Sequence, residues 1–263
     1  MITIRGSEEL ARLEQASWVV LETLDVLAEA VAPGVTTEEL DRIAAEEIRK
    51  RAARPAFLNY RGFPKTICTS VNDEVVHGIP GKRSLKEGDI VGIDCGAIVE
   101  GYYGDAARTL AVGRIDAARR KLLEVTREAL AAGIAAARPG GRVSDIGAAV
   151  EAVALAHRYG VVREFVGHGV GTALHEEPQV PNYGPAGRGS TLKPGMVLAI
   201  EPMFNLGSGD VRVEKDGWTV RTRDRSASAH FEYTIAIVPA GRVVLGTGRL
   251  GAIGAREAAE VPA

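Results

Sequence analysis

The feature that most constrains this chain is a set of titratable residues inside segments that read as buried strands or glycine-flanked turns. The set consists of Asp94, Asp105, His168, Glu201 and Glu232. Burying one ionised carboxylate costs several kcal/mol unless positive charge compensates it. No nearby run of Lys or Arg supplies that charge. Two divalent cations would balance four carboxylates and a neutral imidazole, and such a pair of ions is a known means of activating water.

The two aspartates lie in neighbouring apolar stretches, Asp94 in DIVGIDCGAIV and Asp105 in GYYGDAARTLAV. The joining residues Val99, Glu100 and Gly101 predict a β-hairpin. Residues that pair directly across a hairpin lie about 5 Å apart. We therefore expect the two aspartates to pair across the strands, on one face of the hairpin.

The other three residues have similar surroundings. His168 lies in VGHGVG, where glycines allow close approach, while Glu201 lies in MVLAIEPMF and Glu232 in AHFEYTIAIV. Any one acid of this kind, taken alone, is more often a strand-end residue in a salt bridge or cap. Taken together, the acids and the histidine favour a metal centre.

Composition narrows the class of protein. A chain of 263 residues with 46% hydrophobic content can bury a large core, as one domain or as two fused halves. The net charge of -2, with no basic run longer than 119–121, argues against nucleic-acid binding. The first residues show neither a signal peptide nor a membrane anchor. Because Cys68 and Cys95 form neither a disulfide framework nor a CxxC site, we expect a cytoplasmic protein.

Two helices are predicted in the first half of the chain. Ser7 is placed to cap the first helix, which ends before Pro33, and Thr36 and Glu39 form a capping box that opens the second. Strand-like segments follow over about 66–71 and 75–79, and then the aspartate hairpin.

The second half repeats this order. A helix is predicted over about 117–137 and another from Ser144 to about 159, before strand-rich sequence. AARPGGRVSDI in this half resembles AVAPGVTTEEL in the first half. We therefore predict one domain, 1–263, built from pseudo-repeats over about 7–113 and 114–248. A loose tail is expected over about 255–263.

The motifs of this chain resemble those of the bacterial type I methionine aminopeptidases, from the first helix to about Leu245. They are NYRGFPKTICTSVNDEVVHGIP, GIDCGAIVEGYYGDAARTL, GHGVGTALHEEPQV, LAIEP and KDGWTVRTRDRSASAHFEYTI. The resemblance implies an α+β pita-bread fold, an internally repeated, pseudo-twofold antiparallel sheet with helices packed on its outer face. It also implies metal-dependent removal of the initiator methionine from new proteins when the second residue is small.

The resemblance also assigns roles to residues. The five residues above are implied to be the ligands of two ions of Co, Mn, Fe(II) or Zn, with Asp105 and Glu232 bridging. Glu201 would also accept the proton of the attacking water. His175 would donate to the developing oxyanion, and His77 would contact the substrate's amide nitrogen. Taken alone, His77 is equally well a satisfied core histidine.

A methionine pocket follows from the same resemblance. The matching positions are Tyr60, Phe63, Cys68, Trp218 and Phe231. Two residues depart from the family pattern, Leu174 where bacterial members often have an aromatic residue and His230 where an amide is expected. A histidine that titrates near neutrality this close to the ions would alter the pH dependence of activity.

Other functions stay open from the sequence. A prolidase-like peptidase would share the fold and some ligands but usually has an additional N-terminal domain. A type II methionine aminopeptidase would carry an insertion before the last ligand. A non-catalytic pita-bread binding protein would have lost ligands, whereas all five are present here. The expected partners are nascent polypeptide N-termini and the ribosome, with no nucleic acid bound directly, no membrane and a monomeric state.

Overall fold

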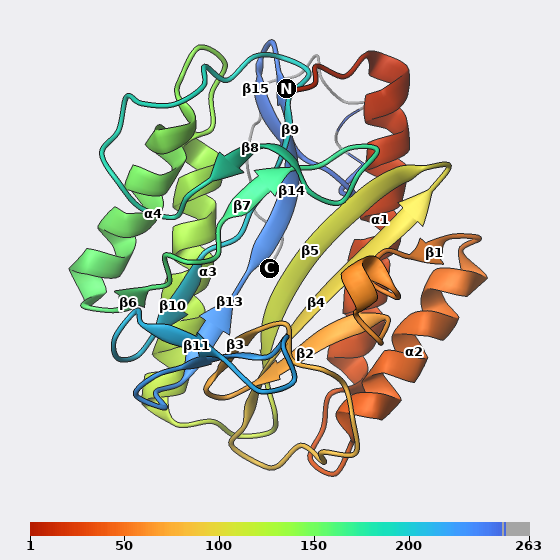
Figure 1. Ribbon diagram of the computed structural model, residues 1–263, viewed down its shortest axis with the longest axis vertical. Coiled ribbons are helices and arrows are strands. Elements are labelled where there is room, and N and C mark those ends of the chain that lie inside the picture. The colour runs from red at the N-terminus through yellow and green to blue at the C-terminus, as the bar shows by residue number, and fades with distance from the viewer. Residues whose placement is uncertain (249, 251–263) are drawn as a thin grey trace.

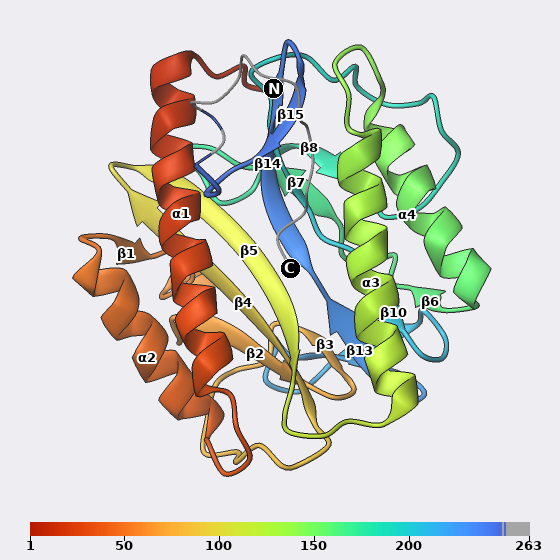
Figure 2. The same ribbon diagram turned by 180° about the vertical axis from the view of Figure 1, so that it is seen from behind.

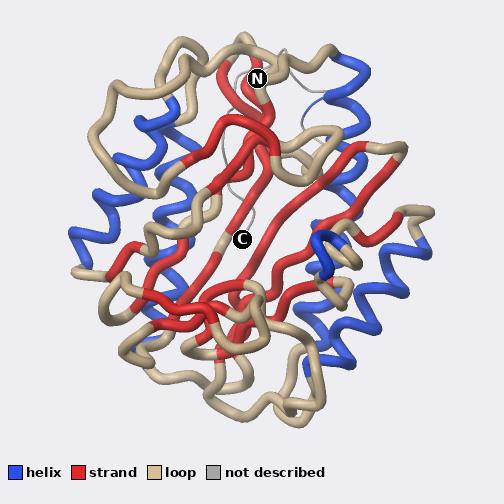
Figure 3. Tube along the Cα trace, in the orientation of Figure 1, coloured by secondary structure: helices blue, strands red, loops and turns tan. Residues whose placement is uncertain are grey.

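The computed structural model describes residues 1–248 and 250, and shows a layer of helices packed against an antiparallel sheet (Figures 1 and 3). Seen from behind, α1 and α2 cover one half of the sheet and α3 and α4 the other (Figure 2). The loose tail predicted over 255–263 lies outside the described residues. The four α-helices of the described residues therefore lie on one face of the sheet.

The helices are α1 (Ser7–Ala30), α2 (Thr37–Lys50), α3 (Ala117–Ala136) and α4 (Val143–His157), with a short 3₁₀ turn, η1 (Tyr60–Gly62). The capping box of Thr36 and Glu39 at the start of α2 is confirmed. Within the described part of the chain, no helix combines the length and apolarity needed to cross a membrane.

Two predicted caps are wrong by one or two residues. At α1 the cap position is Gly6, whose N–H donates to Glu9, and Ser7 is already helical. At α4 the cap position is Arg142, whose N–H donates to Asp145 at 2.7 Å. Ser144 lies inside α4, where its hydroxyl accepts from a loop N–H instead. In both helices an acid in the first turn satisfies the cap.

The strands fall into a large sheet and two small ones. The large sheet contains β1 (Arg54–Pro55), β2 (Ile67–Val71), β4 (Ile90–Val99), β5 (Tyr102–Ala111), β7 (Gly167–Gly169), β8 (Glu176–Val180), β9 (Val197–Ile200), β14 (Glu232–Val238) and β15 (Gly241–Val244). The small sheets contain β3 (Glu74–Val76), β6 (Gly160–Val161), β10 (Met203–Asn205), β11 (Val211–Val213), β12 (Val220–Thr222) and β13 (Ser228–His230).

The order of strands in the large sheet is β1-β4-β5-β14-β9-β7-β8, and β14 joins the strands of the two halves of the chain. It pairs antiparallel with β5 on one side and β9 on the other. Strands that are far apart in sequence therefore meet at the centre of the sheet (Figure 1).

The predicted hairpin is present as β4 and β5, but its register differs from the expected pairing. Asp94 lies opposite Ala107, and Asp105 lies opposite Gly96. The two aspartates are thus diagonal neighbours on one face and not a directly opposed pair. The reason is a two-residue loop of Glu100 and Gly101, both with positive φ, which sets the register of the whole hairpin.

The main core lies between the helices and the sheet and is filled by aliphatic side chains of both. Close approach of α1 to β5 depends on Gly104. A Cβ at this position would lie 2.5 Å from the backbone of Ala16 and Ser17 on α1. Because the helices pack this closely against the sheet, the strands that carry the expected ligands are held in fixed positions.

The two halves of the chain share a local arrangement. Each half has a helix pair followed by strands, and the residue before its second helix forms an isolated antiparallel bridge further along the chain. The bridges are Thr36 to Ser84 and Arg142 to Thr191. This arrangement supports the predicted pseudo-repeats, whose boundaries stay a prediction.

Candidate metal centre and substrate cavity

The five predicted ligands come together on the face of the sheet opposite the four α-helices. They come from five segments: Asp94 on β4, Asp105 on β5, His168 on β7, Glu201 directly after β9 and Glu232 at the start of β14. All five line one cavity of about 320 Å³. The central position of β14 explains this convergence, because it brings β5 and β9 to either side of Glu232.

The spacing of the polar atoms suits a bound cation. His168 Nε2 lies 3.5 Å from Glu201 Oε1 and 3.8 Å from Asp105 Oδ2. Ligand atoms of Asp105, His168 and Glu232 lie within 4.8 Å of one another. The Nδ1 of His168 lies 2.9 Å from the carbonyl of Gly169, so it can donate there and leave the lone pair of Nε2 facing the carboxylates.

Several oxygens of this cluster have no protein partner. In the described part of the chain, Asp94 Oδ1, Asp105 Oδ1 and Glu232 Oε1 are buried without a hydrogen bond. No Lys or Arg of the described residues forms an ion pair with Asp94, Asp105, Glu201 or Glu232. Buried acceptors of this kind require a cation, and carboxylate oxygens with one imidazole nitrogen fit a divalent metal ion.

Burial raises the pKa of each carboxyl in the cluster. The pKa of Asp94 rises to about 7, chiefly by desolvation. Desolvation and then the charges of neighbouring carboxylates raise the pKa values of Asp105, Glu201 and Glu232 well above their ordinary range. Desolvation lowers the pKa of His168 to about 4, so its imidazole is neutral and able to bind metal.

The other end of the cavity is apolar. A buried cluster of Phe57, Phe63, Cys68 and Leu174 packs there, with Tyr60 and Trp218 partly buried against it. Cys68 on β2 pairs with Asp94 on β4, which joins the apolar end to the carboxylates. One cavity thus combines a polar, metal-binding end with a pocket for an apolar side chain.

The structure brings together all but one of the predicted site residues. Tyr60, Phe63, Cys68, His77, Trp218 and His175 line the cavity beside the five ligands. The placement of Phe231 in the pocket is wrong. Phe231 lies in the main core under the guanidinium of Arg127 from α3. Side chains alternate along an extended chain, so His230 and Glu232 face the cavity and Phe231 faces the helices.

His175 lies at the exposed edge of the cavity, next to the ligand His168. Their ring centroids are 4.2 Å apart. The hydroxyl of Tyr60 lies 2.8 Å from His175 Nδ1, and the two rings stack. When the phenol donates to Nδ1, Nε2 carries the ring proton and can donate into the cavity. Desolvation, and next the charge of Arg61, lowers the pKa of His175.

His77 follows β3 with a left-handed backbone, φ 59°, and its ring lies edge-to-face against Phe165 and Trp218. Desolvation, with a smaller contribution from His175, lowers its pKa to about 4. In the described part of the chain, it lines the cavity and forms no ion pair with the carboxylates. His77 is therefore a neutral cavity-lining group and not a core histidine.

Residues that sequence reasoning missed complete the lining, namely Phe57, Arg61, Val76, Glu164, Phe165 and Val166. Leu174 and His230, which depart from the family pattern, line it too. Phe57 comes from the irregular stretch before η1, whose sequence carries no strand or motif signal. Desolvation lowers the pKa of His230 to about 3, so the expectation that it titrates near neutrality is wrong.

A salt bridge from the N-terminal segment holds the turn that carries His175. The guanidinium of Arg5 donates to both carboxylate oxygens of Glu176 at 2.7 Å. Glu176 Oε1 also accepts from the backbone N–H groups of Thr172 and Ala173. A Cβ on Gly171 would lie 2.0 Å from the guanidinium, so only glycine leaves room for this contact.

Arg5→Met is expected to lower the free energy of unfolding by about 3 kcal/mol. The ion pair is largely buried, and removing one partner of such a pair leaves an uncompensated charge. Urea unfolding of both proteins measures the change. Arg12→Met is the matched control, because Arg12 pairs with Glu100 at an exposed site and should cost less than about 1 kcal/mol. Equal effects of the two substitutions would contradict this role of Arg5.

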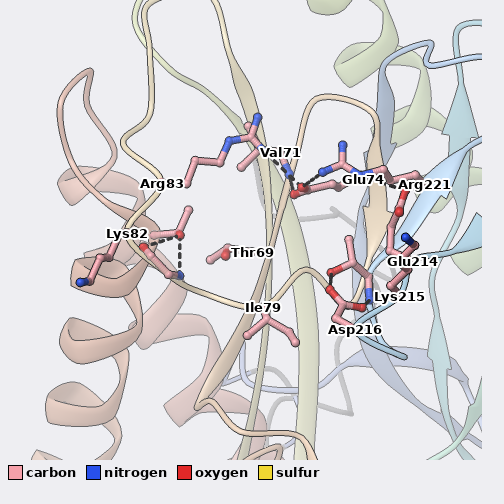
Figure 4. A pocket seen from close by; sticks show the side chains of 13 residues that line it. Thr69, Val71, Glu74, Ile79, Lys82, Arg83, Glu214, Lys215, Asp216 and Arg221 are labelled. Carbon is pink, nitrogen blue, oxygen red and sulfur yellow. Dashed lines mark hydrogen bonds and ion pairs between the residues drawn. The ribbon is translucent and has the colours of Figure 1, made fainter.

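A larger cavity of about 520 Å³ lies beside β2, β3 and the segment between β11 and β12 (Figure 4). The carboxylates that line it, Glu74, Glu214 and Asp216, already have partners. Glu74 accepts from Val71 N–H and from the guanidinium groups of Arg83 and Arg221. The side chain of Asp216 is bound to Thr219. The unpartnered carboxylates lie in the smaller cavity, which is therefore the candidate site.

Comparison with known proteins agrees with this geometry. The profile of metallopeptidase family M24 matches residues 11–239. The methionine aminopeptidase of Clostridium acetobutylicum is 50% identical over 246 residues, which cover 93% of this chain and 98% of that protein.

Solved structures show the same likeness. The crystal structure of methionine aminopeptidase from Rickettsia prowazekii matches with a TM-score of 0.92 at 44% identity, over 94% of this chain and 100% of that one. The prolidase from Pyrococcus furiosus matches with a TM-score of 0.74 at 22% identity, over 93% of this chain and 65% of the prolidase, which is a likeness of fold. The expected α+β pita-bread fold is confirmed.

Proposed function

Because the chain belongs to metallopeptidase family M24, we propose that it is a methionine aminopeptidase. It hydrolyses the first peptide bond of a polypeptide and releases the N-terminal methionine when the second residue is small. The observation that carries this function is the single cavity with metal-binding carboxylates at one end and a buried apolar pocket at the other. A non-catalytic binding protein would not need the unpartnered carboxylates.

The cofactor is a pair of divalent metal ions held by Asp94, Asp105, His168, Glu201 and Glu232. When bound, such ions polarise the scissile carbonyl and make water more acidic. The mixture of carboxylate oxygens and imidazole nitrogen suits Mn, Fe(II), Co or Zn. The unpartnered oxygens of Asp94, Asp105 and Glu232 support this assignment.

The apolar end of the cavity binds the methionine side chain. Phe57, Phe63, Cys68 and Leu174 are buried there, and Tyr60 and Trp218 close it from the more exposed side. An unbranched thioether adapts its shape to such a pocket and makes favourable contacts with aromatic rings. Binding of this side chain places the first peptide bond beside the carboxylates.

Protons are moved by residues of the chain itself. Glu201 faces the cavity beside His168, so it accepts a proton from the attacking water and passes it to the leaving amine. Water adds to the carbonyl carbon, and His175 donates from Nε2 to the oxygen that gains negative charge. His77 contacts the amide nitrogen of the scissile bond and so helps to orient it.

The substrates are nascent polypeptides with an N-terminal methionine, processed in the cytoplasm by a monomer near the ribosome. The apolar pocket for a single N-terminal side chain supports this proposal.

The metal-loaded protein is expected to cleave Met-Ala-Ser and Met-Gly peptides at least about 100-fold faster than Met-Lys or Met-Leu peptides. His77, Phe165 and His175 line the cavity, and a large second side chain would displace them. Release of free methionine, measured by chromatography, gives kcat/KM for each peptide. Equal rates on Met-Ala and Met-Lys, or preference for leucine in first position, would show a general aminopeptidase.

A prolidase-like activity is the second candidate to be tested in the same assay. It rests on shared fold, because the Pyrococcus furiosus prolidase resembles this chain in fold at 22% identity. A Met-Pro dipeptide and a Met-Ala-Ser peptide should therefore be compared at equal concentration. Preferential cleavage of the dipeptide would favour the prolidase-like function.

A further inference from the structure

His230 faces the carboxylates from a strand outside the large sheet. It ends β13, and only 4% of its surface is exposed. The hydroxyl of Thr109 on β5 accepts a hydrogen bond from the backbone N–H of His230 at 2.9 Å. The same hydroxyl donates to the backbone carbonyl of His230 at 2.8 Å. These bonds fix the backbone of His230, so the imidazole is held on the same side of the chain as Glu232.

The imidazole nitrogen that faces the cluster has no partner. Within the described part of the chain, His230 Nε2 is buried without a hydrogen bond. It lies 3.7 Å from Glu201 Oε2 and 3.9 Å from Glu232 Oε2, which is too long for a hydrogen bond. The nitrogen therefore faces one oxygen of each of two carboxylates without a hydrogen bond to either.

The position of His230 matches that of the expected ligand His168. The Nε2 of His168 lies 3.5 Å from the other oxygen of Glu201 and 3.8 Å from Asp105. Glu201 thus presents one oxygen to each imidazole. Two atoms that bind one ion at about 2.1 Å lie roughly 3 to 4 Å apart, and both histidines keep this spacing from their carboxylates.

We propose that His230 is an additional metal ligand, which binds through Nε2 an ion that Glu201 and Glu232 also hold. This inference rests on the proposed function only in requiring that the cavity bind metal. The second nitrogen changes the chemistry of the site, because imidazole favours Zn, Fe, Co and Ni over Mg and Mn. The chain should therefore bind its ions more tightly, and with more preference for those metals, than an oxygen-rich site with one histidine.

Titration of the metal-free protein with CoCl₂ in a calorimeter tests the affinity. His230→Gln is expected to weaken at least one Co²⁺ binding step by about 10-fold or more, a loss of the size that follows removal of groups supporting metal ligands. His77→Gln is the matched control for affinity, because His77 lines the same cavity but its ring contacts Phe165 and Trp218. Equal affinity of the parent and His230→Gln would overturn the proposal.

Proton NMR of the Co²⁺-loaded protein counts the coordinated imidazoles without relying on activity. An imidazole bound through Nε2 keeps a proton on Nδ1, which gives a strongly shifted signal that disappears in D₂O. The parent should show two such signals; His230→Gln should lose one and His168→Gln the other. A single signal in the parent would mean that His230 does not bind the ion, and this result would overturn the proposal. A protein with both signals but no release of methionine from Met-Ala-Ser would refute the proposed function alone.

Discussion

Removal of the metal ions is expected to abolish peptide hydrolysis, and Asp105→Ala is expected to do the same. Asp105 faces both His168 and Asp94, and one of its oxygens is buried without a partner. Without a cation, the four carboxylates repel one another and no metal ion polarises the substrate carbonyl. Turnover of Met-Ala-Ser, before and after dialysis against chelator and after addition of single metals, measures the effect.

The controls separate loss of metal from loss of fold. Asp210→Ala removes an exposed aspartate that binds Ser208, so it should keep full activity and metal content. Circular dichroism of Asp105→Ala should match that of the parent, while its metal content, measured by mass spectrometry, should fall. Undiminished turnover in chelator, or in folded Asp105→Ala, would contradict the metal-dependent mechanism.

Metal binding by the metal-free protein should also depend on pH. Its buried carboxyls have raised pKa values, that of Asp94 about 7, so they hold more protons than in the unfolded chain, and their contribution to the free energy of unfolding falls as pH rises toward 7. The lowered pKa values of His77, His168 and His230 act in the opposite direction, because these imidazoles hold fewer protons than in the unfolded chain below about pH 6.5. Metal binding should release the carboxyl protons and tighten with rising pH, with more proton release at pH 6 than at pH 8. Calorimetry in two buffers of different ionisation enthalpy measures the protons.

His175→Ala is expected to reduce kcat by about 10²- to 10³-fold, while metal content and KM stay near those of the parent. Its Nε2 donates to charge that forms only in the transition state, and removal of one such donor typically costs ~2.7 to 4 kcal/mol. Steady-state kinetics together with metal analysis separate the two effects. Metal loss in this variant would identify His175 as a ligand, and unchanged turnover would show that it has only a structural role.

Two further variants test the contact between Tyr60 and His175 and provide a control away from the cavity. Tyr60→Phe removes the hydroxyl that lies 2.8 Å from His175 Nδ1, so it should lower kcat in the same direction but by less than His175→Ala. His157→Ala removes a histidine at the end of α4 that stacks on Tyr159, away from the cavity, and should leave kcat unchanged. Unaltered kcat in Tyr60→Phe would mean that the phenol does not set the tautomer of His175.

Much of the local structure followed from short-range patterns. The capping box of Thr36 and Glu39 defined the start of α2, and apolar periodicity predicted α3 over almost its observed length. Two N-cap residues were predicted wrongly, because the N-cap positions are Gly6 and Arg142 and not Ser7 and Ser144. A cap depends on which residue adopts an extended backbone, and several neighbouring polar residues can satisfy the same N–H groups.

The register of the strands and the side of the sheet on which each side chain lies required the tertiary structure. A two-residue loop placed Asp94 diagonally across from Asp105, although the sequence favoured direct pairing. Phe231 and His230 are neighbours in sequence, yet one faces the core and the other the cavity. A change of one residue in register or phase reverses the face of every side chain in a strand, so composition alone does not settle it.

The sequence by itself determined the ligand types, because four acids and a histidine in apolar segments need a cation wherever they meet. Only the tertiary structure decided which further residues share that cavity. Phe57, Glu164 and Phe165 reach it from segments that carry no common motif, through contacts among distant parts of the chain. Such contacts depend on how the strands and loops pack against one another, and a local sequence pattern does not determine that packing.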